Sequence, residues 1–229
     1  MVSGAPIHVS EKPTLPDWPS SDAGVSARSL GVLISGRGSN LQSIIDAIAA
    51  RRLDATIGLV LSSRADAPGL QRARDAGIPA LYLSPRDYAD RDGYDQALAT
   101  LLIQHRIALV CLAGFMRLVG PKLLEAFSNR ILNIHPSLLP CFPGVDAQRQ
   151  AFEYGVRVTG ATVHLVNAQL DGGPIILQAT VPVLDDDTVE TLAARVLAEE
   201  HRLYPAAIDV ILGGGWSIDG RRFIRGARL

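Results

Sequence analysis

The chain contains few cysteines, and neither is placed to form a metal or redox motif. Cys111 and Cys141 are the only two among 229 residues, with no CxxC spacing and no Cys/His cluster. This pattern excludes a disulfide framework and a zinc site of the usual spacing. We therefore expect two reduced thiols in a cytoplasmic protein.

Long apolar runs and a strong charge excess are also missing. No stretch reaches the roughly 18 apolar residues that a membrane span needs, and the N-terminal segment lacks the basic start and apolar core of a secretory signal. The formal net charge is −1, which argues against tracking along a nucleic-acid backbone but leaves room for a local anion pocket. We expect small-molecule ligands, no nucleic acid, no membrane, and either a monomer or a homodimer.

The composition of the chain suffices for one sizeable core, either as a single α/β domain or as two closely packed lobes, since 48% of the residues are hydrophobic and 20% are charged. The first 28 residues are an exception, because Pro6, Pro13, Pro16 and Pro19 lie among Ser, Asp and Gly. This composition does not support a regular element. We expect a disordered extension over residues 1–28 and a single domain over residues 29–229.

Apolar stretches of strand length alternate with helical spacing through most of that domain. Strands are predicted over residues 30–34, 57–61, 80–83, 108–112, 131–135, 161–166 and 175–183. Helices are predicted from residue 39 or 40 onward and over 67–76, 91–105, 121–127, 148–154 and from about 187, with a hairpin over 216–224. The alternation is typical of an α/β fold with a Rossmann-like, doubly wound, mostly parallel sheet, here followed by an antiparallel C-terminal portion.

The first strand runs into a glycine-rich turn, Ser35-Gly-Arg-Gly-Ser-Asn40. Ser39 and Asn40 are natural N-cap residues for the helix that follows. Free backbone N–H groups and the helix dipole favour a phosphate there, although a tight structural turn is the alternative. The third glycine of a dinucleotide fingerprint is missing, and no GK[ST] phosphate loop occurs in the chain. A single phosphomonoester fits better than a dinucleotide.

Two polar residues interrupt the strand predicted at 131–135. Asn133 and His135 alternate with apolar neighbours, so they share one face, and Pro136 ends the strand. Asp171 follows 38 residues later in another polar turn. A structural hydrogen-bonded pair is the simpler interpretation of Asn133 and His135. An amide, an imidazole and a carboxylate brought together could instead stabilise an oxyanion and move protons.

The segment that follows the strand at 108–112 is unusually apolar for a loop. Phe115, Met116 and Leu118 either form the wall of a pocket for a flat apolar ligand or pack under the next helix. Arg117 either meets an acidic ligand or is solvated. Both alternatives remain open from the sequence.

Two further polar residues lie within apolar patterns. His164 alternates with apolar neighbours on a predicted strand, and we expect it to be structural unless it approaches Asp171. Glu200 lies close to the apolar stripe of the last long helix, where an unpaired charge is costly. We therefore expect Glu200 to have a polar partner or ligand.

Five segments, taken together, resemble the folate-dependent phosphoribosylglycinamide formyltransferases of purine synthesis. They are Leu33–Leu41 (LISGRGSNL), Leu112–Arg117 (LAGFMR), Asn133–Pro140 (NIHPSLLP), Leu170–Pro174 (LDGGP) and the pair Glu200–His201. The resemblance extends from about residue 31 to residue 211 and implies the formyltransferase fold.

The resemblance implies that the amine of glycinamide ribonucleotide attacks the formyl carbon of 10-formyltetrahydrofolate. The attack would pass through an oxyanionic tetrahedral intermediate, without a covalent enzyme intermediate and without a metal. Asn133 and His135 would bind the oxyanion. Asp171 would keep His135 protonated and assist proton transfer from the amine, in agreement with the expected effect of a neighbouring carboxylate.

The resemblance also implies binding roles for other residues. Gly38, Ser39 and Asn40 would hold the substrate phosphate, and Glu200 would contact the ribose. The folate would contact a set of residues from three segments: Arg91, Met116, Arg117, Leu118, Val119 and Asn133. Among departures from the family pattern, Asp146 stands where many members carry His, so a second acid near Asp171 is expected to alter its charge state.

Three alternatives have specific expectations. Methionyl-tRNA formyltransferase would need a further C-terminal domain, whereas only a short hairpin is expected after residue 211. Formyltetrahydrofolate hydrolase would need a regulatory domain in front, which 28 proline-rich residues do not provide. A nucleotide-binding regulatory module without turnover would be expected to lack part of the set Asn133, His135 and Asp171, all of which are present.

Overall fold

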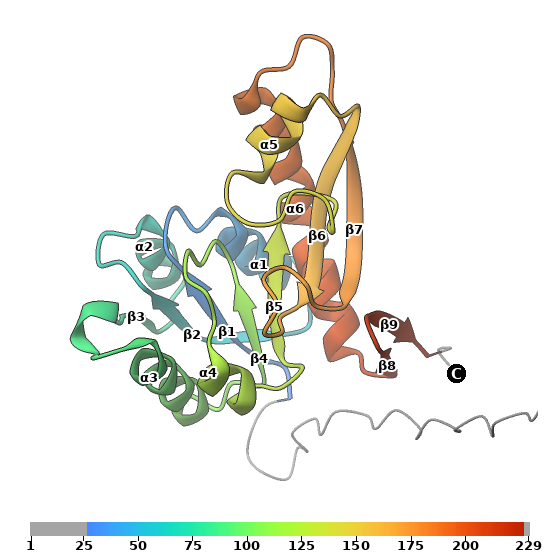
Figure 1. The fold of residues 1–229 in the computed structure, drawn as a ribbon. Coiled ribbons are helices and arrows are strands. Elements are labelled where there is room, and N and C mark those ends of the chain that lie inside the picture. The colour runs from blue at the N-terminus through green and yellow to red at the C-terminus, as the bar shows by residue number, and fades with distance from the viewer. Residues whose placement is uncertain (1–26, 227–229) are drawn as a thin grey trace, which may run out of the picture.

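A computed structural model describes residues 27–226. Its strands form one nine-stranded sheet in the order β3-β2-β1-β4-β5-β6-β7-β9-β8 (Figure 1). The first five strands are parallel: β1 (Ser29–Ile34), β2 (Thr56–Ser62), β3 (Ala80–Tyr82), β4 (Leu109–Leu112) and β5 (Ile131–His135). The rest of the sheet contains antiparallel pairs and is made of β6 (Val158–Leu165), β7 (Ile175–Pro182), β8 (Trp216–Asp219) and β9 (Arg222–Arg225).

Helices cover both faces of the sheet. They are α1 (Ser39–Ala49), α2 (Pro68–Asp75), α3 (Arg91–Gln104), α4 (Pro121–Ala126), α5 (Ala147–Tyr154) and α6 (Val189–Leu212). Local sequence fixes several of their ends: Pro68 and Pro121 occupy first-turn positions, and Thr188 forms a capping box with Thr191 at the start of α6. Within residues 27–226, none of the helices has both the length and the hydrophobicity of a membrane span.

The two faces of the sheet bury separate cores, because strand side chains alternate in direction. Leu30, Val32 and Ile34 of β1 belong to the core that includes residues of α1, α2 and α6. Leu33, from the same strand, belongs to the core that includes residues of α3 and α4. The long hairpin of β6 and β7 rises beyond the parallel strands, next to α5 and the first turns of α6 (Figure 1).

The predicted fold class is confirmed: a doubly wound, mostly parallel sheet carries an antiparallel C-terminal part. The strand order reverses at β1, which has β2 on one side and β4 on the other. The chain therefore leaves β1 and β4 toward opposite sides of the sheet, and open α/β sheets bind ligands at such a point.

One expectation about local structure was wrong, and another concerns residues that the structure mostly does not describe. The N-cap of α1 is Gly38, with φ 72° and no side-chain cap, so the expectation of Ser39 or Asn40 as N-cap was wrong. The backbone must turn sharply in the left-handed region at this point, which favours glycine. Apart from its last two residues, the extension predicted over residues 1–28 lies outside the described residues.

Candidate active site

The end of β5 presents polar side chains on one face of the sheet. Leu132 and Ile134 belong to the core shared with α1 and α6, so Asn133 and His135 project from the opposite face. β6 runs antiparallel beside β5 and places His164 directly opposite Asn133. The strand pairing thus adds a second histidine to the amide and imidazole predicted at this strand end.

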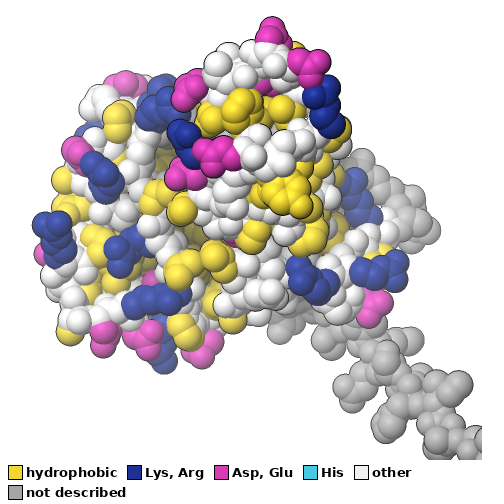
Figure 2. Space-filling model, turned by 45° about the horizontal axis from the view of Figure 1, so that its top comes forward, with side chains coloured by type: hydrophobic (Ala, Val, Ile, Leu, Met, Phe, Trp, Pro, Cys, Tyr) yellow, Lys and Arg dark blue, Asp and Glu magenta, His cyan; other side chains and the backbone are white. Residues whose placement is uncertain are grey.

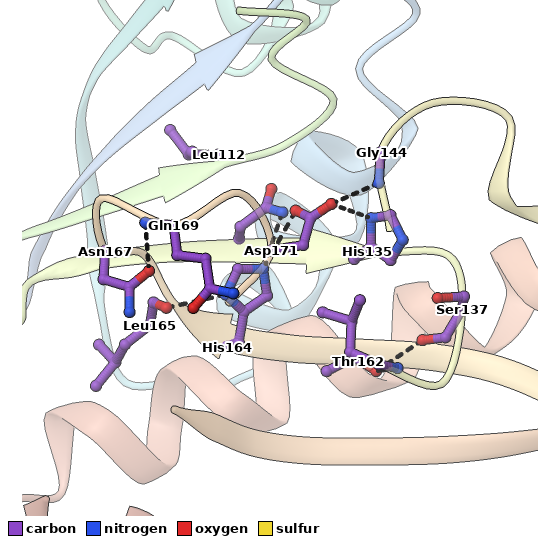
Figure 3. A network of polar contacts seen from close by, with 12 residues as sticks. Leu112, His135, Ser137, Gly144, Thr162, His164, Leu165, Asn167, Gln169 and Asp171 are labelled. Atoms are coloured by element: carbon purple, nitrogen blue, oxygen red, sulfur yellow. Dashed lines mark hydrogen bonds and ion pairs between the residues drawn. The ribbon is translucent and has the colours of Figure 1, made fainter. Parts of the chain in front are cut away.

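His135 is buried, at 4% exposure, between two hydrogen-bonding groups. Its Nε2 lies 2.8 Å from the carbonyl oxygen of Phe142, which can only accept, so Nε2 carries a proton. Its Nδ1 lies 3.6 Å from Oδ2 of Asp171, and the same oxygen accepts a 2.7 Å hydrogen bond from the backbone N–H of Gly144 (Figure 3). Asp171 therefore links the imidazole to the loop that follows β5.

His164 approaches Asp171, which is the condition under which its sequence position indicated more than a structural role. Burial lowers the pKa of His164 below its ordinary value, and the Leu165 carbonyl and Asp171 oppose this shift. The neutral ring donates from Nδ1 to the Leu165 carbonyl at 2.9 Å. Its Nε2 then accepts from the Asn133 amide at 3.2 Å and lies 3.8 Å from Oδ1 of Asp171. His164 orients Asn133, a role that only the β5–β6 register discloses.

Thr162 anchors the loop that follows β5. Its buried hydroxyl donates to the carbonyl of Ser137 at 2.6 Å and accepts from the backbone N–H of Leu139 at 3.0 Å. Gln178 of β7 donates both to this hydroxyl, at 3.0 Å, and to the Leu139 carbonyl, at 2.9 Å. Neighbouring strands thus hold the start of the loop over His135, as Figure 3 shows for Thr162 and Ser137.

Three non-glycine residues around His135 adopt left-handed backbone conformations. The φ angles are 53° at Phe142, 54° at Asp146 and 48° at Asp171. Such conformations store strain and persist where the surrounding contacts over-determine them. The side chain of Asp146 is exposed, and among the described residues it is not a partner of Asp171. The expected coupling of a second acid to Asp171 has no contact to support it.

The glycine-rich turn lies at the carboxyl end of β1. A Cβ added to Gly38 would stand 2.7 Å from the Cα of Gly69 in α2, so close packing and the positive φ both require glycine. The N–H of Gly69 donates to the Gly36 carbonyl at 3.1 Å and fixes the turn. α1 therefore begins with its first backbone N–H groups, including those of Ser39 and Asn40, at a rigid and narrow turn.

The side chain of Asn40 points toward α6. Its amide nitrogen donates to Oε2 of Glu200 at 2.7 Å, and both residues are buried. Burial raises the pKa of Glu200, and the bond from Asn40 opposes that shift. Glu200 thus has the polar partner expected from its position. Among the described residues, the buried Oδ1 of Asn40 accepts no hydrogen bond.

Comparison with known proteins identifies the family. The model of the formyl transferase family matches residues 28–208. The chain belongs to the formyl transferase family. It is 46% identical to phosphoribosylglycinamide formyltransferase of Escherichia coli K12 over 83% of this chain and 87% of that protein. It is 43% identical to the trifunctional purine biosynthetic protein adenosine-3 of Chironomus tentans, of whose length it spans 14%.

A solved member of this formyl transferase family has a similar structure. Glycinamide ribonucleotide transformylase 1 from Symbiobacterium toebii is 56% identical, with a TM-score of 0.85 over 86% of this chain and 93% of that one. The resemblance to phosphoribosylglycinamide formyltransferases that the five segments indicated is confirmed.

In this formyl transferase, each of the two interpretations left open by the sequence holds for part of the apolar loop after β4. Phe115 and Val119 are partly buried against the core shared with α3 and α4. Met116 and Leu118 are 74% and 59% exposed, respectively. Arg117 is exposed as well. Half of the loop packs under the fold, and the other half presents an apolar and cationic surface.

Arg91 supports that loop from the N-terminus of α3. Its guanidinium donates to the carbonyl of Val119 at 2.6 Å and lies 4.0 Å from Oδ2 of Asp95. Asp95 is buried and accepts from the N–H of Gly120 at 2.5 Å, while burial raises its pKa. Arg91 fastens the loop, and its predicted contact with the folate stays a prediction. Asp95 had no recognisable signal in the sequence.

The predicted site residues group around neighbouring strand ends. The turn at Gly38 follows β1, the loop with Met116 follows β4, and His135 ends β5, and these three strands are adjacent in the sheet. The backbone N–H of Met116 donates to Oγ of Ser35 at 2.9 Å, which ties the first two segments together.

Proposed function

We propose that the chain transfers the formyl group of 10-formyltetrahydrofolate to the amine of glycinamide ribonucleotide. The observation that carries the proposal is the cluster of His135, Asp171, Asn133 and His164 at the end of β5. A protonated imidazole and an oriented amide are the donors that acyl transfer needs for its developing oxyanion. The names of the 46% identical Escherichia coli protein and of the 56% identical solved structure support the same reaction.

In this proposal, His135 and Asn133 stabilise negative charge on the formyl oxygen. Asp171 lies 3.6 Å from Nδ1 of His135, where it serves as counter-ion to the imidazolium and accepts a proton released from the amine. His164 stays neutral and holds the Asn133 amide through a 3.2 Å hydrogen bond. His164 is therefore a positioning residue.

One hydrogen bond must change before His135 can donate from Nε2 to a substrate. The Phe142 carbonyl occupies that N–H, and the hydroxyl of Ser137 lies 3.2 Å from the same oxygen. Phe142 has a left-handed φ of 53°, so a change of its backbone conformation releases strain as well as the carbonyl contact. The loop after β5 then opens the catalytic N–H to the substrate.

The other end of the ribonucleotide fits the turn after β1. Gly38, Ser39 and Asn40 offer backbone N–H groups at the start of α1, where a phosphate is favoured. The unpartnered Oδ1 of Asn40 and the carboxylate of Glu200 are acceptors for ribose hydroxyl groups. An interaction of this kind would also satisfy the buried amide oxygen.

The folate supplies the activated formyl group, and the residues after β4 suit its aromatic body and acidic tail. Met116 and Leu118 offer exposed apolar side chains, and Arg117 offers a cation. Val119 fixes the base of the loop through its carbonyl bond with Arg91, so Arg91 acts on the folate by positioning this loop.

The decisive assay mixes the chain with glycinamide ribonucleotide and 10-formyltetrahydrofolate and follows the release of tetrahydrofolate. We expect release that depends on both substrates and formylglycinamide ribonucleotide as the product. Tight binding of the ribonucleotide without any tetrahydrofolate release would contradict the proposal and would indicate a binding module instead.

A further inference from the structure

One face of α6 contacts all three segments around which the proposed site is built. Glu200 and Tyr204 are four residues apart, so they lie on the same face of the helix, and both are buried. Glu200 accepts the hydrogen bond from Asn40, at the start of α1. Tyr204 reaches the other two strands: its hydroxyl lies 3.0 Å from the carbonyl oxygen of Leu112 in β4 and 3.2 Å from that of Leu132 in β5.

The hydroxyl of Tyr204 lies where β4 and β5 part. The register of β4 with β5 ends at the pair Leu112 and Asn133, whereas β5 continues beside β6 as far as His135. Leu112 is the last residue of β4 before the apolar loop, and Leu132 directly precedes Asn133. One phenolic O–H, shared between two carbonyl oxygens, therefore links the segment that is proposed to hold the folate to the strand that carries the oxyanion donors.

Tyr204 is a neutral donor beneath the surface. Its side chain is 0% exposed, and burial raises its pKa well above the ordinary value. Burial also raises the pKa of Cys111, which shares a hydrogen bond with this hydroxyl, to about 12. Figure 2 turns the upper end of Figure 1 toward the reader and shows hydrophobic side chains among charged ones on that face. Substrates meet this outer surface, so Tyr204 acts on them only through the backbone that it binds.

We infer that Tyr204 is a positioning residue for formyl transfer, which sets the distance between the loop after β4 and the amide of Asn133. The inference rests on the proposed function, which places the formyl folate at that loop and the oxyanion donors on β5. Misplacing reacting groups by about 1 Å lowers a rate about 100-fold, so a smaller shift of β4 against β5 is already measurable. A hydroxyl that only stabilises the fold would instead affect stability without a selective loss of rate.

The test is Tyr204→Phe, which removes the hydroxyl and keeps the ring. We expect the single-turnover rate of formyl transfer to fall about fivefold, because the donors no longer match the formyl oxygen. KM for each substrate should stay within about twofold, because the hydroxyl contacts neither substrate. The loss of a buried hydrogen bond should lower Tm by about 3 °C. An unchanged transfer rate would overturn the inference.

The matched control is Trp216→Phe, which removes another buried hydrogen bond to a backbone carbonyl. Nε1 of Trp216 donates to the carbonyl of Ile211 at 3.0 Å, at the C-terminal end of α6. This variant should lower Tm at least as much as Tyr204→Phe and leave the transfer rate unchanged. Equal losses of rate in the two variants would overturn the inference, because the rate would then follow stability.

A second readout compares Tyr204→Phe in the unmodified chain and in Asn133→Ala. In the Asn133→Ala background, the effect of Tyr204→Phe on the rate should shrink to less than about twofold, because the amide that it positions is gone. A fivefold loss that persists in this background would overturn the inference. Tetrahydrofolate release by the unmodified chain would still uphold the proposed function in that case. Absence of release from the unmodified chain would remove both.

Discussion

The turn after β1 and the loops around the end of β5 differ in how they are built. The turn relies on backbone, and its left-handed residue is Gly38, where a positive φ carries little strain. The loops around His135 rely on side chains. Their left-handed residues are Phe142, Asp146 and Asp171, and a positive φ stores more backbone strain at these non-glycine residues than at glycine. The comparison indicates a rigid binding end for the phosphate and a strained, rearrangeable end for catalysis.

Removing the imidazole should have the largest effect. We expect His135→Ala to lower kcat about 100-fold or more, because the variant loses an oxyanion donor and a proton carrier, while KM for the ribonucleotide stays nearly constant. Steady-state kinetics measure both constants. His105→Ala is the control, since His105 is exposed at the end of α3. Near-normal turnover in His135→Ala would remove the assigned role.

A methyl group at Gly38 should test the rigid end. Gly38→Ala meets the Cα of Gly69 at 2.7 Å and needs φ 72°, so we expect a loss of about 2 kcal/mol in the free energy of unfolding. KM for the ribonucleotide should rise about tenfold, because the N–H groups of α1 shift. Gly36→Ala is the control, since no atom lies within 4 Å of its added Cβ. Equal effects of the two substitutions would contradict the packing argument.

His164 tests whether Asn133 must be oriented. His164→Leu removes the acceptor for the Asn133 amide, and kcat should fall about tenfold, whereas His164→Gln restores an acceptor and most of the activity. Burial lowers the pKa of His164, so its contribution to stability is present at neutral pH and is lost as pH falls below the unfolded value of about 6.5. Between pH 8 and pH 5, the Tm of His164→Gln should therefore fall less than the Tm of the unmodified chain. A kcat for His164→Leu equal to that of the unmodified chain would argue against orientation.

Replacing Glu200 should give the smallest effect. It should increase the free energy of unfolding, whereas Gly38→Ala should decrease it. Burial raises its pKa above the ordinary 4.5, so its contribution is fully present below that pH and is lost as pH rises through the folded value. Glu200→Gln resembles the protonated form and should be more stable at pH 7 by about 1 kcal/mol, or roughly 3 °C in Tm. The gain should vanish near pH 4, and kcat/KM for the ribonucleotide should fall. A gain that persists at pH 4 would exclude this electrostatic cause.

The parallel strands and the glycine turn were predictable because their signals are local. The run over residues 30–34 and the alternation around Asn133 depend on nearest neighbours along the chain. The role of His164 was not predictable, since it depends on the antiparallel register that sets it opposite Asn133. The support of the apolar loop by Arg91 and Asp95 was hidden for the same reason, because it joins residues from α3 to a distant segment.

The most direct test of the division between the two regions is kcat/KM for the ribonucleotide in the double variant Gly38→Ala, His135→Ala. If the turn binds and the strand end catalyses independently, the loss in the double variant should equal the product of the two single losses, within about twofold. A double variant no worse than His135→Ala alone would contradict the account, because both regions would then serve the same step.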